Sequence, residues 1–298
     1  MFMDFDAITL LAVVFLAATI NGALGYGFSS ITVPIALLFY TNRLLNPAMV
    51  FVEVVLNSYV LFINRKSLPL VLKRVAPILI GLVLGVMGGS HILFSANPAW
   101  IKFFTYAILL PLILLQAAGL RRPIHSERAV GVPFGAGVGV LYSLTTISGP
   151  PLALLFNNQG FRKEEFRAAL SLIRVAESTL TATAYYFLGL YTFESGRLLF
   201  SVVPSVALGV PIGAYLIHRL DAETFRRICM SFDAWVVAFG FSRVLIEIGL
   251  APDPMAYGVL LTAALIDGYL LARYFRRTAG GGAEYPSGSL ENALVRRK

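Results

Sequence analysis

Two short stretches place hydroxyl-bearing side chains beside glycine or proline within otherwise apolar sequence. The first tip, GYGFSS, covers residues 25–30, and the second tip, TTISGPP, covers residues 145–151. Glycine permits tight turns and proline is tolerated in the first turn of a helix, so we expect each tip to end one half-helix and begin the next. The free N–H groups and the positive dipole end of a helix N-terminus attract anions. The two tips therefore predict an anion-binding site.

The hydroxyl groups of the tips would add hydrogen-bond donors to those backbone amides. The alternative is that they cap their own helices or bond back to the carbonyl group four residues earlier. The candidate substrate-binding residues are Asn21, Tyr26, Ser29, Ser30, Thr145, Thr146, Ser148, Gly149 and Arg174.

Three charged residues lie inside apolar segments, where each needs a partner or a function. Glu53 lies near the middle of residues 47–63, and Arg174 and Glu177 lie within residues 168–190, spaced to share one helical face. A charge at the centre of a membrane helix costs roughly 2.5–3.5 kcal/mol on insertion scales, so such residues usually face a polar interior. Arg174 could bind an oxyanion through two hydrogen bonds, and Glu53 or Glu177 could carry a proton. The alternative is a structural Arg174–Glu177 ion pair, shared with Glu53.

Other polar or small residues of the apolar segments suggest lesser roles. Asp233 and Arg243 are too far apart to pair on one helix. Asp267 is close to the basic end of its segment, so we expect it to be solvated. The glycines at 131, 135 and 139 have the spacing of a helix-packing face.

The sequence carries no motif of a hydrolase or metalloenzyme. It contains no HExxH, no GxSxG and no pair of aspartates at catalytic spacing, and its one cysteine, Cys229, belongs to no CxxC motif. We therefore expect no enzymatic activity, no metal and no cofactor.

The composition indicates a protein that spans a membrane. Of its 298 residues, 57% are hydrophobic and 13% are charged, whereas a soluble domain is about one-quarter charged. The mean hydropathy is +0.77. The formal net charge is +8, but the basic residues gather in short connections between apolar segments, which argues against nucleic acid as a partner. Membrane lipid is the expected surrounding.

Charge also predicts the topology of the chain. The connections rich in Lys and Arg are 64–74, 120–128, 157–167, 218–227 and the tail from residue 273. The opposite connections hold only Arg43, Lys102 and Arg197. The positive-inside rule makes the first group cytoplasmic, with the N-terminus outside and the C-terminus inside. Residues 129–157 then enter and leave on one side, as a re-entrant hairpin or as a pair of short crossings.

The two halves of the chain match each other. PIALLF at 34–39 aligns with PLALLF at 151–156, which places Gly22 opposite Gly139 with no gap. Each half reads as one hairpin plus three crossings, and this odd number of crossings inverts the second copy. The predicted fold is an all-α polytopic membrane protein with two inverted repeats and one extra C-terminal helix. The expected parts are a first repeat 1–119 (hairpin 7–41, helices 47–63, 70–93 and 99–119), a cytoplasmic linker 120–128, a second repeat 129–247 (hairpin 129–157, helices 168–190, 197–218 and 225–247), a transmembrane helix 254–274 and a disordered tail 278–298.

A glycine-containing break that runs into PxALLF, with an inverted second copy near residue 135, resembles the TauE/SafE sulfite exporter family of permeases. The resemblance covers roughly residues 8–275. It implies transport of sulfite and small organosulfonates, with export at the expense of the proton gradient. The tips of that family are glycine clusters of the GxGGG kind, whereas the tips of this chain carry hydroxyl groups.

These observations predict a secondary transporter of small anions in the cell membrane, with sulfite or an organosulfonate as substrate. Alternating access would expose a midplane site at the two tips as one repeat rocks against the other. Protons are the expected coupling ion, carried by Glu53 or Glu177. The alternatives are an uptake permease for another small solute and a passive anion channel. The sequence leaves the oligomeric state open.

Overall fold

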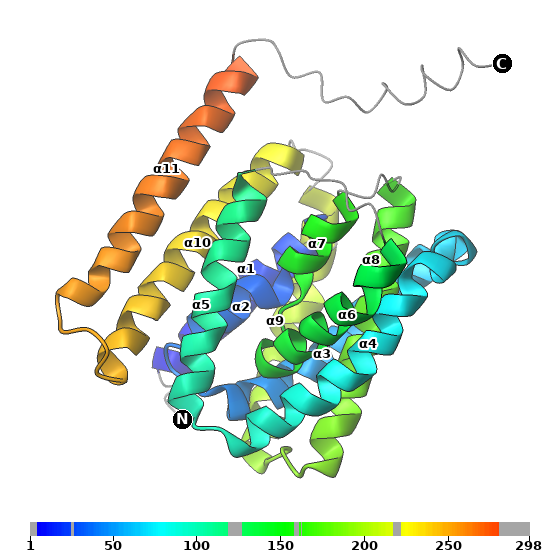
Figure 1. Ribbon diagram of the computed structural model, residues 1–298, viewed down its shortest axis with the longest axis horizontal. Coiled ribbons are helices and arrows are strands. Elements are labelled where there is room, and N and C mark those ends of the chain that lie inside the picture. The colour runs from blue at the N-terminus through cyan, green and yellow to red at the C-terminus, as the bar shows by residue number, and fades with distance from the viewer. Residues whose placement is uncertain are drawn as a thin grey trace.

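The described part of the chain is entirely helical, which confirms the predicted all-α class. The computed structural model describes residues 5–24, 27–118, 127–157, 161, 163–216 and 222–279, and no strand occurs within these ranges (Figure 1). Tyr26, most of the expected linker and the tail after residue 279 lie outside them. The α-helices are α1 Phe5–Leu24, α2 Phe28–Ala36, α3 Asn42–Ile63, α4 Leu68–Ser95, α5 Pro98–Ala117, α6 Glu127–Thr145, α7 Gly149–Asn157, α8 Lys163–Phe187, α9 Phe193–Leu216, α10 Ala222–Glu247 and α11 Gly258–Ala279, with short 3-10 helices at Arg65–Ser67 and Met255–Tyr257.

Six stretches of helix are long and apolar enough to cross a membrane. They are Asn42–Ile63, Arg65–Ser95, Pro98–Ala117, Phe193–Leu216, Arg227–Glu247 and Met255–Arg276. Large apolar side chains on their outer surfaces are exposed, such as Leu84 on α4, Phe200 on α9 and Leu265 on α11. Such a surface suits contact with lipid rather than with water. The protein is therefore an integral membrane protein.

Both tips are breaks between a long helix and a half-length helix. α2 and α7 have 9 residues each, so each is about 14 Å long, roughly half of a ~30 Å hydrocarbon core. Gly27, which precedes α2, has a φ of 101°, and Thr146, which follows α6, has a φ of 55°. Positive φ is easy for glycine and uncommon for a β-branched residue, so Thr146 is held there by its surroundings. α2 ends at Ala36, before the end of the expected 7–41 hairpin, and a turn follows it.

The half-length helices lie inside the bundle, between two pairs of long helices. α2 contacts α3 and α10, and α7 contacts α8 and α5. α3 packs against α8, and α5 packs against α10, with α11 at the outer edge beside α10 (Figure 1). Each tip is therefore placed between the α3–α8 pair and the α5–α10 pair.

Two further helix pairs pack through glycine at very short range. A β-carbon added at Gly85 on α4 would lie 2.1 Å from the Ala136 carbonyl oxygen on α6, and one added at Gly213 on α9 would lie 1.8 Å from the Thr19 carbonyl oxygen on α1. The expected packing face of α6 is confirmed, because a β-carbon at Gly135 would lie 2.1 Å from the Ile78 carbonyl oxygen on α4. Only glycine lets the two backbones approach this closely.

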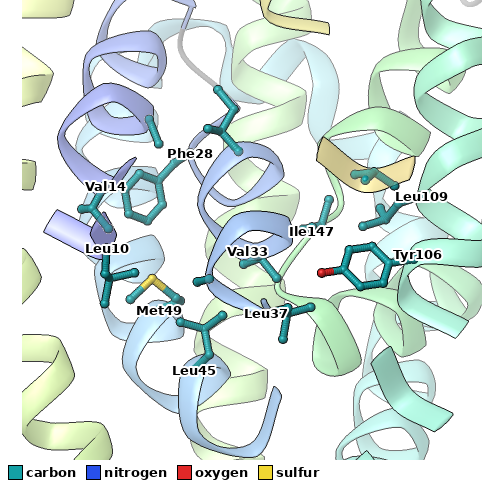
Figure 2. Close-up of a cluster of buried hydrophobic side chains, with 14 of the residues drawn as sticks. Leu10, Val14, Phe28, Val33, Leu37, Leu45, Met49, Tyr106, Leu109 and Ile147 are labelled. Carbon is teal, nitrogen blue, oxygen red and sulfur yellow. The ribbon is translucent and has the colours of Figure 1, made fainter. Parts of the chain in front are cut away.

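A hydrophobic cluster fixes α2 between its neighbours (Figure 2). Phe28 and Val33 of α2 are fully buried among side chains of α1, α3 and α5, including Val14 and Met49. The Tyr106 hydroxyl of α5 donates a hydrogen bond of 2.8 Å to the Pro34 carbonyl oxygen. That carbonyl lies in the last turn of α2, where no intrahelical donor is available, so Tyr106 satisfies it.

The prediction that Asp267 is solvated was wrong. Its side chain on α11 is fully buried, and Arg227 on α10 donates a hydrogen bond of 2.9 Å to its carboxylate. Arg227 is itself 4% exposed. The sequence suggested solvation because Asp267 is near a basic segment end, but its partner Arg227 comes from the preceding helix.

The glycine contacts lead to a test of packing. Gly85→Ala places a methyl group against the α6 backbone, so we expect destabilisation of about 1–3 kcal/mol from overpacking. Gly88→Ala on the same helix is the matched control, because nothing lies within 4 Å of the added carbon. Thermal unfolding of the two variants in detergent measures the difference. Equal melting temperatures would contradict the close α4–α6 approach.

Candidate functional site

A buried ion pair joins α3 to α8 beside the two tips. Arg174 Nη2 donates hydrogen bonds to both carboxylate oxygens of Glu53, at 2.8 Å to Oε1 and 2.7 Å to Oε2. Glu53 is fully buried and Arg174 is 3% exposed. Arg174 therefore pairs across helices and not with Glu177, its neighbour on α8. Of the arrangements considered from sequence, the contact with Glu53 is the one present.

A serine of each tip donates a hydrogen bond to a glutamate of the following long helix. Ser29 Oγ donates to Glu53 Oε1 at 2.5 Å, and Ser148 Oγ donates to Glu177 Oε1. The other Glu53 oxygen also accepts a bond of 2.9 Å from the Asn57 side-chain amide. The structure thus brings Ser29, Ser148, Glu53, Arg174 and Glu177 together. We call Glu53, Arg174 and Glu177 the charge cluster.

The charge cluster contains polar atoms that are buried and have no partner. They are Nε and Nη1 of Arg174 and Oε2 of Glu177. The Tyr142 hydroxyl on α6 is likewise buried and unpaired, and Tyr142 lies close enough to all three charged residues to interact with them electrostatically. Buried polar groups are nearly always satisfied, so unpaired atoms that gather in one place suggest room for a bound group.

The helix N-termini differ in the amide donors that they offer. The first turn of α2 contains Phe28, Ser29 and Ser30, whose N–H groups precede any intrahelical acceptor. α7 begins Gly149-Pro150-Pro151, and proline has no N–H group. The next amide, that of Leu152, donates to the Ser148 carbonyl oxygen at 3.2 Å. The amide donors expected at both tips are therefore supplied mainly by α2.

The threonines of the second tip serve the local backbone, as in the alternative weighed from sequence. Thr145 Oγ1 donates to the Leu141 carbonyl oxygen at 2.7 Å and accepts a bond of 3.0 Å from the Ile147 amide. Thr146 Oγ1 donates to the Thr145 carbonyl oxygen at 2.7 Å. Asn21 is buried in α1, and Ser30 lines a small cavity where the tips meet α5 and α10. Tyr26 lies outside the described residues.

Sequence reasoning missed the residues that hold the end of α6. The side-chain amides of Asn42 and Asn46 on α3 both donate to the Leu144 carbonyl oxygen, at 2.9 and 2.7 Å. The Tyr185 hydroxyl on α8 donates to the Ser143 carbonyl oxygen. These bonds satisfy carbonyl groups that the break leaves open. Two asparagines one turn apart, in the connection between the expected hairpin 7–41 and helix 47–63, were the available signal.

No group of His, Cys, Asp and Glu that could hold a metal ion occurs in the ranges that the structure covers. The candidate site instead consists of one guanidinium, two carboxyl groups and hydroxyl donors. Half-length helices that meet at buried charges inside a bundle are characteristic of secondary transporters.

A comparison with protein families agrees with this class. The sequence pattern of the family Sulfite exporter TauE/SafE matches residues 10–240, and the chain belongs to this family of membrane transporters. The match covers both tips and the charge cluster, and it ends within α10, so α11 lies beyond it. No curated protein and no solved structure matches the chain.

The ion pair leads to a test by a double-mutant cycle. Glu53→Ala leaves the Arg174 guanidinium buried without its hydrogen-bonded carboxylate, so we expect a loss of about 3–5 kcal/mol of stability. Adding Arg174→Ala removes the orphaned charge and should recover much of that loss. Thermal unfolding of the wild type, both single variants and the double variant in detergent measures the coupling. Additive effects would contradict a direct pair.

Proposed function

We propose that the protein is a proton-coupled secondary transporter that exports small anions, with sulfite or an organosulfonate as substrate. The observation that carries this proposal is Arg174, whose Nε and Nη1 are buried without a partner between two carboxyl groups. A guanidinium with free donors suits a pair of oxygens of an oxyanion. The first-turn amides of α2 are the additional donors that we assign to the substrate, and Ser29 and Ser148 join them only after their hydroxyl groups leave Glu53 and Glu177.

The charge of the cluster explains why protons would be coupled to the anion. With Glu53, Arg174 and Glu177 all ionised, the cluster carries one net negative charge, and an added anion would make a closed site still more negative. Such an excess of charge is costly away from water. A proton on Glu177 makes the cluster neutral, so that the free donors of Arg174 can bind the anion. Proton uptake and anion binding therefore favour each other.

Because a proton and an anion bind together, we expect both to cross the membrane in the same direction. Export is then driven by the outward gradient of the anion, and a proton leaves with each anion. An exchange of incoming protons for outgoing anions, as the family resemblance implies, would require the anion to bind beside ionised carboxylates. The charge balance of the cluster argues against that order of events.

Alternating access around inverted repeats is supported by the helix contacts. In an inverted repeat, α1 to α5 would correspond in order to α6 to α10. The α1–α9 contact then has the α6–α4 contact as its counterpart, and the α2–α10 contact has the α7–α5 contact; all four occur. The α3–α8 and α5–α10 contacts each join a helix to its own counterpart. The serine–glutamate bond also occurs once in each half. The charge cluster is closed to solvent, as expected of an occluded state. We place the protein in the cell membrane with its C-terminus in the cytoplasm.

Proteoliposomes test this proposal with methanesulfonate, a small organosulfonate that remains an anion at any working pH. With the membrane potential clamped at zero, we expect the anion to accumulate on the alkaline side of an imposed pH difference. Each coupled proton makes one pH unit equivalent to about a tenfold concentration ratio, since a tenfold ratio corresponds to about 1.4 kcal/mol. Unlabelled sulfite should compete for transport.

Glu177→Gln should reduce the accumulation ratio by about tenfold per pH unit, because the cluster then lacks one titrating group. Glu194→Gln on α9 is the matched control, since Glu194 is exposed. Accumulation on the acidic side would show exchange in place of co-transport. Transport that only equilibrates the anion, without any response to pH, would indicate a channel, and no transport of either anion would refute the substrate class.

A further inference from the structure

A small cavity lies where the tips meet α5 and α10, and no residue of the charge cluster lines it. Its volume is about 30 Å³. Gly27 and Ser30 line it from the first tip and Pro150 from the second, and Gln116 on α5 and Asp233 on α10 lie across from them. The cavity is large enough for a water molecule, which needs at least about 10–15 Å³ of such space.

Two polar atoms at this cavity are buried and have no partner. One is Oδ1 of Asp233, a residue that is 7% exposed, and the other is Nε2 of Gln116. An amide N–H group donates and a carboxyl oxygen accepts, so one water molecule could accept from Gln116 and donate to Asp233. The pairing of a buried acceptor, a buried donor and a cavity of this size fits a hydrated carboxyl group.

No cation compensates the Asp233 carboxyl group within the described ranges. The buried ion pairs there join Arg174 to Glu53 and Arg227 to Asp267. An ionised carboxylate without a cation, at membrane depth, is strongly unfavourable, and acidic residues at such positions commonly belong to proton pathways.

We propose that Asp233 is a second proton-binding group of the transport cycle, distinct from Glu177, which takes up and releases its proton through a water molecule in this cavity. The inference rests on the proposed proton-coupled transport and extends it. Because both tips line the cavity, movement of either tip changes the access of water to Asp233. Protonation of Asp233 is thereby linked to the same elements that hold the anion site.

The neighbours of Asp233 contain few groups that could titrate in its place. Cys229, one turn earlier on α10, also lines the cavity and interacts with Asp233 electrostatically. From α11, Asp267 faces α10 but is paired with Arg227. α2 carries no titratable side chain, and neither does the part of α1 whose side chains are described. The groups at the other end of α5 and α10 are Lys102, Tyr106, Arg243 and Glu247, which line a separate cavity of about 530 Å³.

The experiment measures the number of protons moved with each anion. In proteoliposomes with the potential clamped at zero, two coupled protons give about a hundredfold methanesulfonate ratio per pH unit, and one proton gives about tenfold. We expect a ratio of about a hundredfold per pH unit for the wild type and about tenfold for Asp233→Asn. Asp253→Asn, in the exposed connection before α11, is the matched control and should behave as the wild type.

Two further measurements keep the test valid if Asp233→Asn transports the anion poorly. Exchange of labelled for unlabelled methanesulfonate at equal pH needs no net proton movement and should persist in Asp233→Asn. Infrared spectra of the wild type should contain a carboxylic-acid C=O band that Asp233→Asn lacks. An unchanged accumulation ratio in Asp233→Asn, or a wild-type spectrum without that band, would overturn the assignment.

The outcomes separate this inference from the proposed function. If wild-type protein moves the anion without any proton, the proposed coupling fails, and the role of Asp233 in it fails as well. If the wild type is proton-coupled and only Glu177→Gln changes the ratio, the proposed function stands and the assignment of Asp233 is refuted. A sodium gradient that replaces the pH gradient, and loses its effect in Asp233→Asn, would also refute a proton at this site.

Discussion

One guanidinium placed between two carboxyl groups, in a space closed to water, is the interaction on which the arrangement at the tips depends. Arg174 holds α8 against α3 through Glu53, and the two serines attach the tips to the carboxyl groups. A buried pair of this kind adds little net stability over an apolar contact, but the loss of one partner is costly. The strength of the contact between α3 and α8 therefore depends on the charges of Glu53 and Arg174.

The surroundings of the tips combine rigid support with unsatisfied polar groups. Asn42, Asn46 and Tyr185 use their donors to hold the last carbonyl groups of α6. By contrast, Arg174 and Tyr142 retain unpaired atoms a short distance away. Satisfied polar groups fix a backbone in place, and unsatisfied ones bind an additional partner. The break in α6 is thus firmly positioned, while the polar groups beside it keep donors free for an additional partner.

Hydropathy and charge predicted the helices and the three members of the charge cluster, because both follow from the cost of placing polar groups in lipid. They could not predict which charges would pair. Arg174 and Glu177 have ideal spacing for a contact on one helix, yet Glu53 binds Arg174 from another helix. The prediction that Asp267 is solvated failed for the same reason, since its partner Arg227 is 40 residues away in the chain. Local spacing contains no information about tertiary neighbours.

The glycine contacts restrict how this bundle can move. Where the backbone of α4 lies directly on α6, and that of α1 on α9, no layer of side chains separates the helices. Sliding along such a contact would drive a neighbouring side chain into a carbonyl group, so movement of one helix against its partner is sterically costly. Each of these pairs takes one helix from the first half of the chain and one from the second. If each pair stays together, a conformational change divides this molecule between interleaved pairs of helices and not at the middle of its sequence.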